Sequence, residues 1–414
     1  MTAHGWSLRC TGCGRAVAPG LPDYCEACGG PVEALLESLP PSAGIFDGRV
    51  TDSWKYVSLY PVAASPPFSL GEGGTPLVGS TPAIARFESV RFKLDHLNPS
   101  GSFKDRSVSV GVAWAVEDGA PGVVCASSGN AAGSVATYAA RAGLPAVIIA
   151  PAETPEPKLA SIEAHGARLL CVSGHFSRSF ALAREVARLL SWVNLTTTFV
   201  NPWACEGLKS VAYELFEQLG KVPEWISVPV GAGPLLRGTF KGYLELQELG
   251  LIERVPRMLA VQPSGCAPVV RAFERDEEVV TGWEEVTTSV SGINDPLQGY
   301  ESDGTLTLRC VRDSDGAACA VTDNEIDAAG RLLATAEGIY VEDAAAASLA
   351  GVMRLRSSGF IEDGESVVCL LTGHGLKRVE HEHRSGKRTV VRNADEALQS
   401  VGELAAADRV GYAS

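Results

Sequence analysis

The stretch Asn98-Pro-Ser-Gly-Ser-Phe-Lys-Asp-Arg106 joins a turn to the start of a helical pattern. Proline, serine and glycine favour the turn, and Lys104 lies where the helix is expected to begin. Because the positive end of a helix dipole opposes an ammonium charge, the pKa of the Lys104 amine should be lowered, and such an amine forms imines readily. Most lysines that follow a turn are solvated surface residues, so this stretch alone assigns no function.

Two glycine-bearing loops add to this pattern. Residues 126–131 (Ala-Ser-Ser-Gly-Asn-Ala) follow an apolar run and open a helical pattern, so their amides and hydroxyls can surround a carboxylate. Residues 230–235 (Val-Gly-Ala-Gly-Pro-Leu) repeat the arrangement later in the chain, and amides with glycine torsions can cradle a phosphate monoester. Many parallel-sheet proteins carry such turns without a ligand, so each loop alone is weak evidence.

Short apolar runs alternate with longer helical patterns after a Pro- and Gly-rich segment at residues 39–83. Buried strands separated by helices indicate parallel sheets. We expect strands at residues 122–126, 146–150, 168–172, 225–230 and 366–371, and helices at 131–142, 177–190 and 207–219.

Cys10, Cys13, Cys25 and Cys28 form two Cys-x-x-Cys pairs near the N-terminus. Each pair can offer two thiolates to one tetrahedral zinc, so the spacing predicts a structural zinc ribbon without a catalytic role. A ribbon that keeps its cysteines reduced without metal, or a redox role for one pair, is the alternative. The other seven cysteines are scattered, which suits a reducing cytoplasm better than a disulfide framework.

The composition narrows the class of protein. At 414 residues, with 45% hydrophobic and 20% charged residues, the chain is expected to form two or three globular domains. The net charge of -14 argues against a general nucleic-acid or anionic-membrane binder. We expect neither secretion nor membrane insertion, because there is no long apolar segment and no leader-like start.

The order of the three motifs, completed by residues 370–375 (Leu-Leu-Thr-Gly-His-Gly), resembles the fold type II pyridoxal-phosphate enzymes. Among these the sequence is most similar to the threonine synthases, from about residue 71 to residue 377. The resemblance implies an α/β fold with two three-layer parallel-sheet domains and an N-terminal zinc-ribbon-like module. It implies this module at residues 1–36, a large cofactor domain at 37–111 and 201–376, a small mobile domain at 112–200, and a C-terminal tail at 377–414.

The resemblance also implies site residues. Lys104 would be the catalytic residue that carries pyridoxal 5'-phosphate and then moves protons at the α and β carbons. Further cofactor contacts are expected from Phe103 beside the ring, Asn130 at the phenolic oxygen, Gly231, Ala232, Gly233 and Leu235 at the phosphate, and Thr372 at the pyridine nitrogen. The expected substrate contacts are Ser127, Ser128, Gly129, Asn130, Ala131 and Lys158. Pro234 has no amide to donate, so the phosphate loop is one donor short.

Three side chains near these motifs have simpler interpretations. Plain core packing is the alternative for Phe103. Asp105 and Arg106 are expected to pair with each other and fix the helix.

A hydroxyl at Thr372, in place of a carboxylate, leaves the pyridine nitrogen largely unprotonated, which favours elimination and replacement over transamination.

The resemblance weakens where a substrate phosphate would bind, because a dianion calls for several cations and amide donors. Lys158 matches a family lysine of this pocket, but Ala204 replaces an arginine and Ala232 an asparagine. Thr198 and Phe199 replace an Asn-Ser pair, and Ala131 replaces a threonine. Arg237, Lys241 or Lys209 could supply replacement charge, with a solvated helix face as the alternative for each.

These observations favour a lyase or replacement enzyme for an L-amino acid with a leaving group at the β or γ carbon. Conversion of O-phosphohomoserine to threonine is the first reaction that the resemblance implies. The alternative is β-replacement or dehydration of O-phosphoserine, serine or threonine, as in cysteate-synthase-like or dehydratase-like relatives. A non-catalytic paralogue that binds the cofactor for stability disagrees with intact Lys104, Asn130 and Thr372. Dimers are common in the family, so a homodimer is expected.

Overall fold

A computed structural model of the chain describes residues 5–81, 89–173, 176–196 and 198–378. The expected C-terminal tail lies outside the described residues from residue 379 onward. The sheets and helices belong to one compact unit that ends at Lys377. Within the described ranges, no helix is both long enough and apolar enough to cross a membrane.

The N-terminal module is a three-stranded antiparallel sheet with the order β2-β1-β3. Its strands are β1 (Trp6–Cys10), β2 (Ala16–Val17) and β3 (Val32–Leu36). Alternate residues of β1 are buried, as in a sheet that packs one face against the rest of the protein. The turns at the ends of these strands bring the four N-terminal cysteines together.

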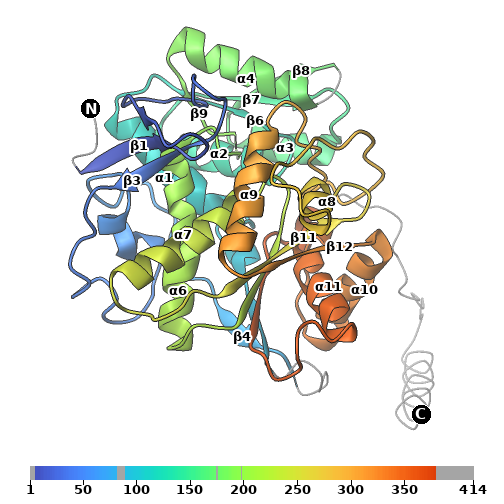
Figure 1. The fold of residues 1–414 in the computed structure, drawn as a ribbon. Coiled ribbons are helices and arrows are strands. Elements are labelled where there is room, and N and C mark those ends of the chain that lie inside the picture. The colour runs from blue at the N-terminus through green and yellow to red at the C-terminus, as the bar shows by residue number, and fades with distance from the viewer. Residues whose placement is uncertain (1–4, 82–88, 174–175, 197, 379–414) are drawn as a thin grey trace, which may run out of the picture. The chain divides into compact units, whose positions relative to one another are not determined.

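A four-stranded parallel sheet has the order β8-β7-β6-β9. Its strands are β6 (Val123–Ala126), β7 (Ala146–Pro151), β8 (Arg168–Val172) and β9 (Val193–Asn194). Helix α4 (Phe176–Leu190) packs on one face, and α2 (Asn130–Ala142) and α3 (Glu156–Ala164) lie on the other (Figure 1). All four residues of β6 are buried, which explains its uninterrupted apolar sequence.

A six-stranded sheet has the order β12-β11-β10-β13-β5-β4 and is parallel except for β4. Its strands are β4 (Leu77–Gly79), β5 (Val90–Lys93), β10 (Trp225–Pro229), β11 (Arg257–Pro263), β12 (Ala317–Val321) and β13 (Val367–Leu370). Helices α10 (Asp323–Ala336) and α11 (Asp343–Ser357) lie on one side, with α7 (Pro234–Glu248) and α9 (Glu301–Asp313) on the other (Figure 1). The remaining helices are α1 (Lys104–Glu117), α5 (Pro202–Cys205), α6 (Ser210–Leu219) and α8 (Pro268–Glu274).

The α/β class with two largely parallel sheets and an N-terminal module is confirmed. The five expected strands are present, each within one residue of its expected ends. The third expected helix begins later, at Ser210, because Glu206–Lys209 form a 3-10 turn. That turn presses against α1, since a Cβ at Gly207 would lie 1.9 Å from the carbonyl oxygen of Arg106. Both sheets belong to the same compact unit, so the domain boundaries at residues 112 and 200 stay a prediction.

Candidate active site

Three loops and the start of α1 meet at the carboxyl ends of the parallel strands. β10 and β13 are neighbours in the large sheet, so the loops that follow them lie side by side. The chain that leads into α1 pairs with the loop after β13, where Ser102 bridges to Gly373 and the Phe103 N–H donates to the Thr372 carbonyl at 3.0 Å. Helix α1 also packs against α2, which begins at Asn130. Open α/β sheets bind ligands at this edge.

Lys104 is the first residue of α1, and its amine lies deep in the protein. Burial lowers the pKa of the amine to about 8, although the nearby carboxyl group of Asp295 acts in the opposite direction. The amine also lies 4.7 Å from the centre of the Phe103 ring. The lowered pKa agrees with the expectation for this lysine, but burial is its main cause.

Asp105 and Arg106 do not pair with each other, contrary to the expectation. The Asp105 carboxyl accepts hydrogen bonds from the amide of Ser100 at 2.6 Å and from its hydroxyl at 2.5 Å. Arg106 instead forms ion pairs with Asp95 at 2.8 Å and Glu214 at 2.6 Å, and all three of these side chains are fully buried. The turn before the lysine is therefore fixed by Asp105, and the first turn of α1 by Arg106.

The loop between β6 and α2 presents hydroxyls and amides to the same edge. The Ser127 N–H donates to the Ile149 carbonyl at 3.1 Å. The N–H groups of Ser128 and Asn130 have no protein acceptor within the described ranges. Free amides at a helix N-terminus bind anions, so this loop fits a carboxylate group.

The loop after β10 has the form of a phosphate cradle. Gly233 has a φ of 104°, and a Cβ there would lie 2.0 Å from the Thr307 hydroxyl, so only glycine fits. That hydroxyl donates to the Ala232 carbonyl at 2.7 Å and so holds the loop from behind. Among the described residues, none accepts a hydrogen bond from the amides of Gly231, Ala232, Gly233 or Leu235. These four amides fit a phosphate monoester, whereas Pro234 begins α7 without one.

Thr372 and Asn130 are brought close to each other by Glu342. The Asn130 amide group donates to the Glu342 carboxylate at 2.6 Å, and the Glu342 N–H donates to the Gly373 carbonyl at 2.9 Å. A Cβ at Gly373 would lie 1.9 Å from the Glu342 carboxylate, so glycine permits this approach. Burial raises the pKa of Glu342. Glu342 therefore orients the Asn130 side chain, a role that the sequence did not indicate.

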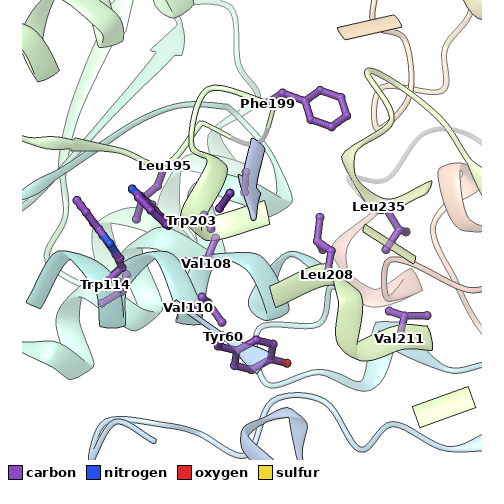
Figure 2. Packing of buried hydrophobic residues seen from close by; sticks show 14 of the residues in the cluster. Tyr60, Val108, Val110, Trp114, Leu195, Phe199, Trp203, Leu208, Val211 and Leu235 are labelled. Atoms are coloured by element: carbon purple, nitrogen blue, oxygen red, sulfur yellow. The ribbon is translucent and has the colours of Figure 1, made fainter. Parts of the chain in front are cut away.

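A small cavity lies beside Lys104, and two of the positions that depart from the threonine synthases line it, Thr198 and Ala204. The other lining residues are Phe103, Lys104, Ser107, Val108, Leu195, Thr196, Asn201, Cys205, Leu208 and Pro234. Figure 2 shows Val108, Leu195 and Leu208 in one packed cluster, beside the stacked rings of Trp114 and Trp203. The wall is therefore firmly packed and mostly apolar.

The expected replacement cations do not reach this cavity. Arg237, Lys241 and Lys209 form ion pairs with glutamates of the N-terminal module and of neighbouring helices, at 2.6, 2.5 and 2.8 Å. They are thus neither pocket cations nor a solvated helix face, and both expectations for them were wrong. Lys158 donates to the Ser291 hydroxyl at 3.3 Å and does not line the cavity.

Two buried carboxyl groups behind the site were not anticipated. Asp303 accepts hydrogen bonds from the Phe199 N–H at 3.2 Å and the Tyr24 hydroxyl at 3.4 Å, and burial raises its pKa to about 8. Asp295 faces Gly231, where a Cβ would lie 3.3 Å from the Asp295 Cβ, and burial raises its pKa as well. Neither belongs to a recognised motif, so no local pattern distinguishes it from a surface residue.

The four N-terminal cysteines lie in one cluster, with all four sulfurs within 4.8 Å of one another. The Cys10 and Cys28 sulfurs are 3.4 Å apart, and those of Cys13 and Cys25 are 3.8 Å apart. Sulfurs at the corners of a tetrahedral zinc site are separated by about 3.8 Å, given a Zn–S distance of about 2.3 Å. The cluster therefore has the size and ligand chemistry of a zinc site.

The fold and the site define a class, and comparison with known proteins agrees. The family described as "Pyridoxal-phosphate dependent enzyme" matches residues 68–373, and the chain belongs to this family. The solved structure of maize serine racemase has the same fold, with a TM-score of 0.63 and 22% identity over 81% of this chain and 93% of that one.

Within the family, several curated relatives are threonine synthases. The threonine synthase of Methanosarcina acetivorans is 35% identical over 90% of this chain and 92% of its own length. That of Mycobacterium tuberculosis is 38% identical over 75% of this chain and 84% of its own length. The chain is thus a threonine-synthase-like, pyridoxal-phosphate-dependent lyase.

Proposed function

We propose that Lys104 carries pyridoxal 5'-phosphate and that the enzyme eliminates or replaces a group at the β or γ carbon of an L-amino acid. The observation that carries this proposal is the enclosed Lys104 amine, with a pKa of about 8, at the meeting point of three loops. A lysine with a lowered pKa is suited to bind a carbonyl cofactor and then to exchange protons near neutral pH.

The remaining cofactor contacts follow from the loops. The amides of Gly231, Ala232, Gly233 and Leu235 would hold the phosphate. In the same way, Asn130 would bind the phenolic oxygen through its second amide hydrogen, Phe103 would pack beside the ring, and Thr372 would face the pyridine nitrogen. When bound, the cofactor withdraws electrons from the substrate α carbon. A hydroxyl at the pyridine nitrogen limits this withdrawal, which supports elimination and replacement over transamination.

The substrate would enter beside the Ser127 to Asn130 loop. The hydroxyls of Ser127 and Ser128, with the free N–H groups of Ser128 and Asn130, would bind its α-carboxylate beside Gly129 and Ala131, and Lys158 would lie at the edge of the site. Once released from the cofactor, the Lys104 amine would accept the proton from the α carbon and return a proton to the product.

Two reactions fit this arrangement. Conversion of O-phosphohomoserine to threonine is supported by the relatives that are called threonine synthases. The second is β-replacement or dehydration of O-phosphoserine, serine or threonine; for its unphosphorylated substrates it is supported by the cavity beside Lys104, whose other lining residues are uncharged.

The test is to incubate the purified enzyme, loaded with pyridoxal phosphate, with each of these amino acids while phosphate, ammonia and 2-oxo acids are measured. We expect turnover of at least one of them, together with a change in the visible spectrum of the cofactor. If the loaded enzyme shows neither with any of them, the proposed reaction class is wrong.

We also propose that Cys10, Cys13, Cys25 and Cys28 bind a structural zinc ion, because their sulfurs have the spacing of a tetrahedral site. Metal analysis of the purified protein should find about one zinc per chain, and C10S should lower both the zinc content and the melting temperature. Full stability in a zinc-free preparation would contradict this. A homodimer and a cytoplasmic location stay predictions, and sedimentation would test the first.

A further inference from the structure

The first cysteine turn of the N-terminal module, residues 10–13, contacts helix α9. The Thr11 carbonyl, inside this turn, accepts a hydrogen bond from the Arg309 guanidinium at 2.9 Å. Thr11 is itself fixed within the module, because its N–H and its hydroxyl both donate to the Pro31 carbonyl, at 2.9 and 3.0 Å. Helix α9 is therefore attached to a segment whose shape depends on the cysteine cluster.

The second cysteine turn, residues 25–28, contacts the beginning of the same helix. Gly29 follows this turn, and its carbonyl accepts a hydrogen bond from the Ser302 hydroxyl at 3.2 Å. Tyr24 precedes the turn, and its hydroxyl donates to the Asp303 carboxyl at 3.4 Å. The two turns thus contact α9 near both of its ends.

Thr307 lies on α9 between these contacts and supports the phosphate loop from behind. Its hydroxyl donates to the Ala232 carbonyl at 2.7 Å, and a Cβ at Gly233 would lie 2.0 Å from that hydroxyl. A movement of α9 towards the loop would therefore press on Gly233, and a movement away would break the bond to Ala232. The position of α9 thus sets the position of the loop whose amides are proposed to hold the cofactor phosphate.

The module also holds α7, the helix that follows the phosphate loop. Arg237 forms an ion pair with Glu33 of β3 at 2.6 Å, and the Lys241 amine donates to the Ala34 carbonyl of the same strand at 2.5 Å. Both cations lie within the first half of α7, whose first turn contains the Leu235 amide. The module therefore contacts the helix behind the phosphate loop and the helix that leaves it.

We infer that the N-terminal module positions the phosphate loop, so that zinc bound by its four cysteines controls how tightly the chain holds pyridoxal phosphate. This inference rests on the proposed function, because it needs the zinc site and the cofactor phosphate where that proposal puts them. Tyr24, Ser302 and Arg309 are then positioning residues, which act on the loop through α9 and Thr307. Without the metal, the two cysteine turns lose their shared ligand, and their contacts with α9 lose a fixed geometry.

The test compares two ligands on the full chain after its own cofactor has been removed. Dissociation constants for pyridoxal phosphate, and for pyridoxal, which lacks the phosphate, are measured from visible absorbance before and after a chelator removes the zinc. We expect zinc removal to raise Kd for pyridoxal phosphate by about tenfold or more, because the loop amides no longer meet the phosphate together. The Kd for pyridoxal should stay the same, since pyridoxal does not use the loop. An unchanged Kd for pyridoxal phosphate, or an equal rise for both ligands, would overturn the inference.

This design separates the inference from the proposed function. A purified chain without zinc, or a zinc-loaded chain that does not bind pyridoxal phosphate, would contradict the proposed function and the inference with it. A chain that binds both, but binds each to the same extent with or without the other, would contradict the inference alone.

A variant decides the matter where the zinc-free chain unfolds. Y24F and R309A, combined in one chain, remove two contacts between the cysteine turns and α9 but keep all four cysteines. Zinc content should match that of the native protein, while Kd for pyridoxal phosphate alone should rise by about threefold or more. R331A, at another exposed arginine that pairs within α10, is the control and should change neither constant. A native Kd for pyridoxal phosphate in the combined variant would overturn the inference.

Discussion

The two sides of Lys104 differ in what they offer a ligand. On the proposed cofactor side lie four loop amides, the Asn130 side chain and the Thr372 hydroxyl; Thr307 supports the loop through the Ala232 carbonyl, and Glu342 orients Asn130. On the cavity side, the lining is apolar or neutral, and the nearby cations are paired elsewhere. We propose that cofactor binding and substrate choice depend on these two different parts of the fold. One part can keep its chemistry while the other changes.

The largest effect should come from removing the group that the two sides share. K104A should lower kcat/KM by about 10³-fold or more, because in the proposed mechanism the lysine is both the attachment point of the cofactor and the acid–base group. The visible absorbance of the lysine-bound cofactor should disappear in the same variant. Absorbance spectra of both proteins with added pyridoxal phosphate measure this, and an unchanged spectrum in K104A would falsify the assignment of Lys104.

The next largest effect tests whether the cofactor side depends on its supporting groups. E342A removes the acceptor that orients the Asn130 amide, and kcat should fall by about tenfold because the amide no longer points at the cofactor. E342Q keeps an acceptor oxygen at the same place and should be closer to the native enzyme. Both variants should retain the native ratio of kcat/KM for hydroxy amino acids to kcat/KM for their phosphate esters. A changed ratio would mean that the two sides of Lys104 are not independent.

The sequence indicated the cofactor side better than the cavity side, for a physical reason. Strand ends, glycine turns and a lysine at a helix start are local patterns, and their order, through the resemblance to the fold type II enzymes, predicted that Lys104, Asn130, Gly231 and Thr372 belong to one site. The cavity depends on contacts between distant segments, such as Tyr24 with Asp303, which no local pattern shows. The same holds for Arg106, whose partners Asp95 and Glu214 could not be found from its neighbour Asp105.

Only some of the strands of the large sheet were predicted from the sequence. The runs at 225–230 and 366–371 were expected from their short apolar sequences. β11 and β12 were not anticipated, although β11 is almost wholly buried.

A smaller effect is expected from Asp303, which should make the melting temperature depend on pH. Burial raises the pKa of Asp303 from 3.8 to about 8, so the folded protein holds a proton that the unfolded chain releases above about pH 4. The stabilisation that this proton gives is complete below that pH and is lost as the pH rises through about 8. D303N cannot lose a proton, so its melting temperature should fall less than that of the native protein between about pH 5 and pH 8.

Calorimetry at a series of pH values measures the difference, with D276N, at an exposed position, as the control. Parallel curves for D303N and the native protein would mean that Asp303 is ionised in the folded state. The cavity would then have a negative group behind its wall, and its discrimination against phosphate would be stronger than the neutral lining alone provides.

The smallest effect should come from Lys158, which was expected to contact the substrate and lies outside the cavity lining. Its hydrogen bond to Ser291 is long, at 3.3 Å, and a partly exposed contact of this kind contributes little, so K158A should change kcat/KM for hydroxy amino acids by about fivefold or less. If Lys158 instead bound a substrate phosphate, K158A would raise KM for O-phosphohomoserine strongly and leave the hydroxy amino acids unaffected. That selective loss would show that the cavity side keeps an anion site at its mouth, and the contrast between the two sides of Lys104 would then be one of position and not of charge.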